Sequence, residues 1–186
     1  MNLPKFEIIV DDEITLRRLR LDSVKIIFKA IDTNRIYLRK WLPFVDQTKK
    51  EEDTEIFIKS IIHSTSPRKD LVYEIWLKKQ FAGLIALKEI DSWNKKTELG
   101  YWLVQDLQGK GVATRSCKAL IKHAFKDLDM NRMQLRIGIG NSKSSMIAER
   151  LNFKFEGIER AGEKHHDRFI DLEVYSLLKE EAAAIL

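Results

Sequence analysis

The spacing of apolar residues predicts how the first third of the chain folds. Apolar and polar residues alternate over residues 6–10 and 13–20, which predicts two strands joined by a pair of aspartates. From about residue 23 the apolar residues recur at intervals of three and four, which predicts a helix. A short helix follows and ends at Pro43, and a longer one begins near Lys50 and ends before Pro67.

After residue 70 the period returns to two, and strands and helices follow in turn. This order predicts one α+β domain over residues 1–186, with a mixed, mostly antiparallel sheet flanked by helices and a frayed tail at 180–186. The predicted strands span 71–77, 81–90, 97–104, 132–138, 153–159 and 169–178, and the predicted helices span 111–127 and 142–151.

Composition and charge narrow the class of protein without naming a function. The 186 residues, 44% of them hydrophobic, suffice for one hydrophobic core. A net charge of +5 favours an anionic partner, such as a nucleic acid, an acidic protein or a phosphate-bearing cofactor. The basic residues are dispersed along the chain rather than clustered, which argues against direct binding of nucleic acid.

The sequence contains neither a membrane span nor a disulfide framework. No apolar run approaches the roughly 20 residues that a span needs. Charged residues interrupt the first 14 positions, unlike those of a signal peptide. The single cysteine, Cys117, excludes an intrachain disulfide. We therefore expect no membrane partner and a location in the reducing cytoplasm.

A turn with two glycines separates the predicted strand 97–104 from the next helix. Gly109 and Gly111 can adopt positive φ and let a ligand approach the backbone closely. The first amides of the helix lack intrahelical acceptors, so with the helix dipole and Lys110 they form a candidate phosphate site. The turn fits neither the Walker A motif, which needs Ser or Thr after the lysine, nor the dinucleotide fingerprint, which needs a third glycine.

The whole junction resembles a known family more specifically than its glycines do. Residues 108–113, Gln-Gly-Lys-Gly-Val-Ala, match the Gln/Arg-x-x-Gly-x-Gly/Ala signature of the GNAT superfamily of N-acetyltransferases. The segments that follow also resemble family segments in order and spacing: 141–144, 150–153 and 155–157. Within the superfamily the chain resembles the ribosomal-protein N-acetyltransferases of the RimJ/RimL type, on the segments 38–46, 100–103 and 171–178.

This resemblance implies acetyl-coenzyme A (acetyl-CoA) as the cosubstrate and assigns residues to it. The strands 97–104 and 132–138 would be parallel and splayed, with the pantetheine arm between them. Backbone groups of Leu103 and Val104 would pair with this arm, and Asn141 would contact it. The backbone amides that would hold the pyrophosphate belong to Gln108, Gly109, Lys110, Gly111, Val112, Ala113 and Thr114.

Acetyl transfer to an amine needs one group that takes the amine's proton and another that protonates the leaving thiolate. The resemblance points to Glu163 as the base, and Glu98 on the central strand is the rival. Ser144, in the Asn-x-x-Ser segment, is the first choice for the acid, and Tyr175 is the alternative. Each also has an ordinary structural explanation as a solvated glutamate, a helix-capping serine or a core tyrosine.

The evidence for a functional role is weaker for several other side chains. His165 and His166 are adjacent and would face opposite sides of a strand, so no metal site is expected. Trp41 and Phe44 would line either the acceptor cleft or the core. Cys117 lies on an apolar helix face, as a buried thiol does.

The resemblance implies a kind of acceptor but leaves its identity open. The RimJ/RimL type implies the α-amine of a protein N-terminus, such as that of a ribosomal protein, which attacks the thioester directly in a ternary complex. A small amine such as a polyamine or an antibiotic is an alternative acceptor. A non-catalytic module that binds acyl-CoA is an alternative function. The superfamily commonly dimerises, so a homo-oligomer is also open.

Overall fold

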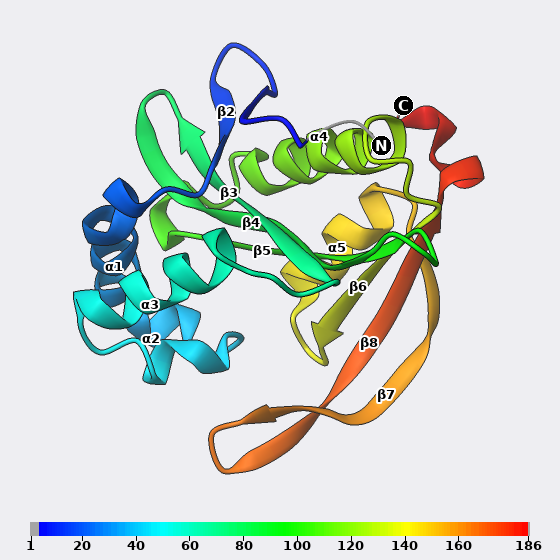
Figure 1. The fold of residues 1–186 in the computed structure, drawn as a ribbon. Coiled ribbons are helices and arrows are strands. Elements are labelled where there is room, and N and C mark those ends of the chain that lie inside the picture. Colours follow the sequence, from blue (N-terminus) through cyan, green and yellow to red (C-terminus); the bar gives the residue numbers. More distant parts are fainter. Residues whose placement is uncertain (1–3, 186) are drawn as a thin grey trace.

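An eight-stranded mixed sheet runs through the middle of the molecule (Figure 1). The computed structural model describes residues 4–185 of the chain. The strand order is β1-β2-β3-β4-β5-β6-β8-β7, and β5 and β6 are the one parallel pair of neighbours within these residues. The bounds are β1 Glu7–Ile9, β2 Ile14–Arg18, β3 Lys69–Leu77, β4 Gln80–Asp91, β5 Lys96–Leu103, β6 Arg132–Gly138, β7 Lys154–His165 and β8 Arg168–Leu178.

The helices divide between the two faces of the sheet (Figure 1), so the predicted α+β class is confirmed. One face carries α1 (Val24–Thr33), α2 (Arg35–Leu38) and α3 (Glu51–Ile62), and the other carries α4 (Val112–Lys126) and α5 (Ser142–Arg150). None of the helices within residues 4–185 has the length and hydrophobicity that crossing a membrane requires. Four short 3-10 helices also occur in the described part of the chain: η1 Leu21–Ser23, η2 Pro43–Asp46, η3 Gln105–Leu107 and η4 Lys179–Ala184.

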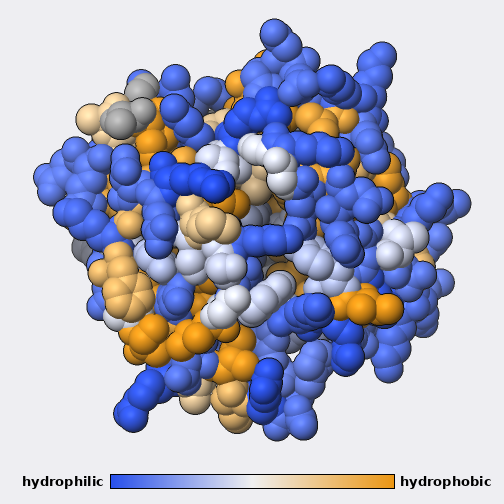
Figure 2. Space-filling model, turned by 180° about the vertical axis from the view of Figure 1, so that it is seen from behind, coloured by the Kyte–Doolittle hydropathy of each residue, from blue (hydrophilic) through white to orange (hydrophobic). Residues whose placement is uncertain are grey.

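Alternation along the strands builds a hydrophobic core on each face of the sheet. On β3, Tyr73 and Ile75 pack on the α4 side, whereas Val72 packs on the side of α1–α3. Ile121 and Phe125 of α4 are fully buried, and burial of such a side chain contributes about 1.5–3 kcal/mol to stability. Seen from behind, the surface is mainly hydrophilic and its apolar residues form separate patches (Figure 2).

The parallel strands β5 and β6 separate along their length. They are paired over residues 96–98 of β5 and 132–134 of β6. Beyond that point β6 stays paired with β8 as far as Gly138, and β5 stays paired with β4 as far as Leu103. The predicted splayed pair is therefore confirmed. Between the two strands the sheet holds an unpaired backbone edge.

β7 and β8 form a long hairpin at one edge of the sheet. β7 runs to His165, six residues beyond the predicted end of this strand at residue 159, because it pairs with β8 up to the turn. The pairing is irregular between Glu159 and Glu163, which lie opposite Leu172 and Ile170, so that β7 has two extra residues there. Such a bulge bends a strand and redirects the side chains that follow it.

The predicted frayed tail at residues 180–186 is wrong for the part that the structure describes. Residues 179–184 form η4, and Ala182 and Ile185 are 1% and 8% exposed in the core on the α4 side. Glu181 accepts a hydrogen bond from the Leu178 amide at 3.0 Å and pairs with Lys154. Two apolar contacts and a capping carboxylate therefore hold the tail. Leu186 lies outside the described residues.

Candidate active site

A cavity of about 750 Å³ opens where β5 and β6 separate. The N-termini of α4 and α5 border it on one side of the sheet, and α2 borders it on the other. Glu163 reaches it from the β7–β8 hairpin. The cavity gathers most of the predicted site residues: Glu98, Leu103, Gln108, Gly109, Gly111, Val112, Ala113, Thr114, Asn141, Ser144 and Glu163.

One end of the cavity presents a run of free backbone amides. Gly109 and Gly111 both have φ of 72°, as the sequence predicted, and Gly111 is the N-cap of α4. Within residues 4–185, no backbone or side-chain acceptor takes the amides of residues 109–114. The amide of Gln108 differs from the prediction, since it donates to the Gln105 carbonyl at 3.2 Å. Six consecutive amides and a helix N-terminus form an anion site.

Lysine and arginine side chains add positive charge to this end. Lys143 donates to the Gln108 side chain at 3.0 Å and lies 6.0 Å from the centroid of the Tyr37 ring. Gln108 in turn donates to the Tyr37 hydroxyl. Arg150 also lines the cavity, whereas Lys110 is exposed and does not. Lys143 and Arg150 were not expected as site residues, although Lys143 stands inside the 141–144 segment.

The open edge of β5 suits an extended ligand. The Val104 amide donates to the Ala82 carbonyl at 2.9 Å, so Val104 faces β4 and its N–H is not free, unlike in the prediction. Because backbone groups alternate along a strand, those of Leu103 and Tyr101 point toward β6 instead. At their level β6 is no longer paired with β5. Leu103 is thus the better placed of the two predicted backbone partners.

Asn141 and Ser144 lie together at the start of α5. Asn141 is the N-cap, and its side-chain oxygen accepts from the Ser144 amide at 3.4 Å. The cap explains why Asn begins this helix. The Asn141 side-chain NH₂ has no acceptor among the described residues and borders the cavity. It could therefore donate to a carbonyl of a bound ligand.

Tyr101 is a site residue that the sequence did not reveal. Its hydroxyl is buried next to Ser144, whose side chain lowers the pKa of the phenol, but within residues 4–185 no group meets it with the geometry of a full hydrogen bond. Burial raises the pKa of this phenol, so it stays protonated. A buried unpaired hydroxyl is costly, and Tyr101 is one of the residues that border the cavity. No periodicity or motif signals it, because the lack of a partner depends on the tertiary structure.

The two candidate bases have different surroundings. Both oxygens of Glu98 are engaged, one by Lys88 and the other by the Arg136 guanidinium at 2.6 Å. Only 12% of the Glu98 side chain is exposed. The Glu163 side chain is 44% exposed, and among the residues that the structure describes it meets one partner, the His165 ring nitrogen at 2.6 Å. Glu98 therefore has a structural role between two cations, and Glu163 keeps an oxygen available.

The alternative acid, Tyr175, lies away from the cavity. Its hydroxyl donates to the Glu173 carboxylate at 3.0 Å, and its ring packs on Phe155 in an edge-on contact. Burial and this hydrogen bond raise the pKa of Tyr175 above its ordinary value. The structure brings Ser144, not Tyr175, to the cavity.

The other residues singled out in the sequence lie in different environments. Trp41 borders the cavity and packs over Gly138, where an added Cβ would lie 3.6 Å from its ring. Phe44 does not border the cavity. Cys117 is fully buried, which raises the pKa of its thiol. His166 meets His165 edge-on, with ring centroids 6.3 Å apart, and pairs with Asp46 at 2.7 Å.

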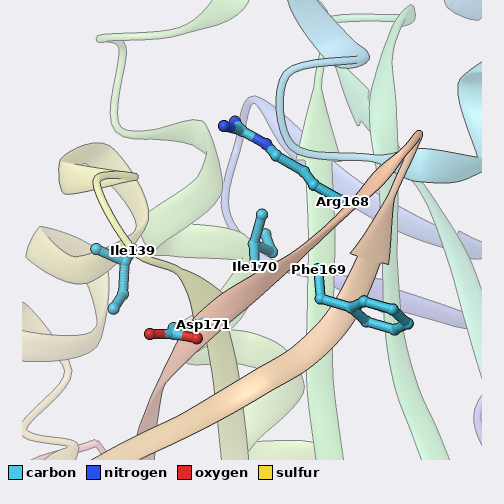
Figure 3. Close-up of a pocket in the computed structure, with 5 residues that line it drawn as sticks. All are labelled: Ile139, Arg168, Phe169, Ile170 and Asp171. Atoms are coloured by element: carbon cyan, nitrogen blue, oxygen red, sulfur yellow. The ribbon is translucent and has the colours of Figure 1, made fainter.

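A second depression, of about 320 Å³, lies along β8 and holds none of the predicted site residues. Figure 3 shows Arg168 and Ile170 on one side of β8 and Phe169 on the other. Ile170 also packs toward Gly138, at 3.1 Å from the position of an added Cβ. This depression is shallow and open compared with the cavity between β5 and β6.

The class of protein follows from this geometry. The cavity combines an anion site, an open strand edge, a carboxylate and a hydroxyl. This combination fits a transferase that binds an extended, phosphate-bearing acyl donor. The chain belongs to the acetyltransferase (GNAT) family, whose domain model matches residues 13–154. It is an N-acetyltransferase, and acetyl-CoA is its cosubstrate.

Relatives and solved structures agree with this assignment. The Bacillus subtilis protein YdaF, described as a "putative ribosomal N-acetyltransferase", is 32% identical over 92% of this chain and 94% of its own. The ribosomal-protein-serine acetyltransferase of Escherichia coli is 26% identical over 90% of this chain and 93% of its own. The microcin C7 self-immunity acetyltransferase MccE, solved with acetyl-CoA and AMP, superposes with a TM-score of 0.85 at 29% identity and covers 91% of this chain and 94% of its own.

Proposed function

We propose that this enzyme acetylates the α-amine of a protein N-terminus, with Glu163 as the general base and Ser144 as the general acid. One observation carries the proposal: both side chains border the same cavity as the free amides of residues 109–114. The hairpin supplies one of them and α5 the other. A donor and an acceptor could therefore meet between them in a single complex.

Acetyl-CoA supplies the acetyl thioester, and the residues of this chain bind it and move protons. The amides of residues 109–114 hold the pyrophosphate, and Leu103 and Asn141 hold the pantetheine arm. Glu163 accepts the proton that the amine loses as its nitrogen bonds to the acetyl carbon. Ser144 donates a proton to the sulfur as the carbon–sulfur bond breaks. The Tyr101 hydroxyl lies next to Ser144.

The charge of the cavity favours a peptide over a polyamine. Its lining contains four basic side chains, Lys88, Arg136, Lys143 and Arg150, and two acidic ones, Glu98 and Glu163. A polyamine carries several positive charges and needs several carboxylates as partners, whereas a protein N-terminus carries one charge and needs fewer. An α-amine has an ordinary pKa near 8, so a single carboxylate is a sufficient base near neutral pH.

The names of the relatives support a ribosomal protein as the acceptor. Such a substrate, together with acetyl-CoA and a single buried cysteine, supports a cytoplasmic location for the enzyme. That location stays part of the proposal.

An acceptor panel tests the proposal. The enzyme is incubated with acetyl-CoA and one of three acceptors: a peptide with a free N-terminal serine, the same peptide with a blocked N-terminus and one lysine, or spermidine. Thiol release and the mass of the product are measured. Acetylation of the free N-terminus alone is expected. Acetylation of spermidine alone would mean that the acceptor is a small amine instead. If the protein binds acetyl-CoA but releases no thiol with any of the three acceptors, a non-catalytic binding module would be favoured.

The roles of the two side chains are tested with substitutions. Glu163→Gln and Ser144→Ala should lower kcat by about 10²-fold or more, because a positioned acid or base contributes about 10²–10⁴-fold. Both variants should still bind acetyl-CoA, since neither residue belongs to the anion site. A normal kcat in Glu163→Gln would show that Glu163 is not the general base.

A further inference from the structure

His165 is a buried histidine that the proposed reaction leaves without a task. Its side chain is 5% exposed, in a hairpin most of whose residues are half-buried or exposed. Its Nε2 lies 2.6 Å from an oxygen of Glu163. The two residues are two positions apart on β7, so their side chains project from the same side of the strand. The buried imidazole therefore contacts one oxygen of Glu163, and Glu163 itself borders the cavity.

The backbone next to His165 is anchored on both sides. His165 pairs with Arg168 across the hairpin. The following residue, His166, contacts Asp46 of η2 at 2.7 Å, and Arg39 binds the same carboxylate at 2.8 Å. The Arg39 guanidinium lowers the pKa of Asp46, which keeps this anchor charged. The turn of the hairpin is thus attached to the α2–η2 segment, close to Trp41 at the cavity wall.

The bulge on β7 explains why Glu163 needs such a partner. Glu163 is the first paired residue after the two extra residues of the irregular stretch. Ala161 within that stretch has φ of 51°, outside the range that strands use. A glutamate with an exposed side chain at such a place can adopt many rotamers. A fixed hydrogen bond from a buried group selects one of them.

We propose that His165 is a positioning residue: its imidazole holds the Glu163 carboxylate in the orientation that faces the acceptor amine. The proposal rests on the function proposed above, because it assigns His165 a role through Glu163. It does not place His165 in contact with either substrate. The two adjacent histidines have different tasks: His165 orients the base, and His166 fixes the turn.

A spectroscopic test needs no acceptor. The side-chain nitrogens of the four histidines are observed by long-range ¹H–¹⁵N correlation, and His165 is assigned with a His165→Gln variant. We expect its Nε2 to carry the proton and its signals to shift in Glu163→Ala, while those of exposed His63 stay unchanged. If Nε2 of His165 carries no proton in the wild-type protein, or if Glu163→Ala leaves the His165 signals unshifted, the proposed hydrogen bond to Glu163 is refuted.

A kinetic cycle tests the role itself, with the acceptor peptide of the panel above. His165→Leu should lower kcat by about tenfold, a fraction of what a general base contributes, and leave the KM for acetyl-CoA unchanged. His165→Gln keeps an N–H donor and should retain kcat within threefold. In a Glu163→Gln background His165→Leu should have no further effect, because residues that act as one unit are not additive.

Matched controls separate positioning from damage to the hairpin. Phe169→Ala removes a large, exposed side chain from the other side of β8 and should keep normal kcat. An equal loss in Phe169→Ala, or a His165→Leu loss that persists in full in the Glu163→Gln background, would overturn the proposal. If His165→Leu does not fold, a His165→Gln enzyme with a tenfold lower kcat would overturn it too. A fully active Glu163→Gln enzyme would instead refute the base, which the spectroscopic contact does not depend on.

Discussion

Replacement of Gly111 by tryptophan should abolish binding of acetyl-CoA. Gly111 caps α4 at the centre of the six free amides, with φ of 72° and with open space around an added Cβ apart from Arg115 at 3.8 Å. An indole there would cover the neighbouring amides. Hydrogen bonds to a charged group contribute about 1.5–3 kcal/mol each, so loss of three of them costs at least about 4 kcal/mol, which is roughly 10³-fold in Kd.

Isothermal titration of acetyl-CoA measures this loss directly. A micromolar Kd for the wild-type enzyme would become millimolar. Positive φ at a residue other than glycine also costs roughly 1–2 kcal/mol of stability, so a Gly157→Trp variant is the control. Gly157 has φ of 142°, open space around it and no place in the cavity. Retention of wild-type affinity by folded Gly111→Trp, or an equal loss in Gly157→Trp, would refute the anion site.

Three further predictions concern stability. Tyr101→Phe should raise the free energy of unfolding in urea by about 1 kcal/mol, because it removes a buried hydroxyl without a partner; an equal loss would mean that the hydroxyl is paired. Ile185→Ala should lower the free energy of unfolding by about 2 kcal/mol, whereas a frayed tail would give no change. Burial lowers the pKa of His123 in the folded state, so the unfolded chain binds more protons and stability should fall as the pH drops through about 6.5. A His123→Gln variant should lose part of this slope between pH 7.5 and 5.5, and an unchanged slope would contradict the assignment.

The order of elements could be predicted because each strand and helix carries its own periodicity. The glycine turn could also be predicted, since positive φ at Gly109 and Gly111 is a local property. The frayed tail was wrong because the environment of Ile185 is formed by residues far away in the sequence.

The choice between the candidate bases depended on the tertiary structure. Lys88 and Arg136, which bind Glu98, come from β4 and β6. His165 is close to Glu163 in sequence, but the predicted strand ended at residue 159, and the contact depends on the extension of β7 to His165. Likewise the sequence predicted that the Val104 backbone would pair with the cosubstrate, but its amide donates to the Ala82 carbonyl. Local patterns therefore located the cofactor segments, and long-range contacts decided which groups are free.

The separation of β5 and β6 links the lifetime of the folded enzyme to the supply of its cosubstrate. A ligand that adds itself to the open strand edge completes the sheet and binds the folded chain but not the unfolded one. At a concentration 100 times its Kd, such a ligand adds about 2.7 kcal/mol to the free energy of unfolding. The folded enzyme is therefore more stable in a cell rich in acetyl-CoA than in a cell that has little of it, with no change in its sequence.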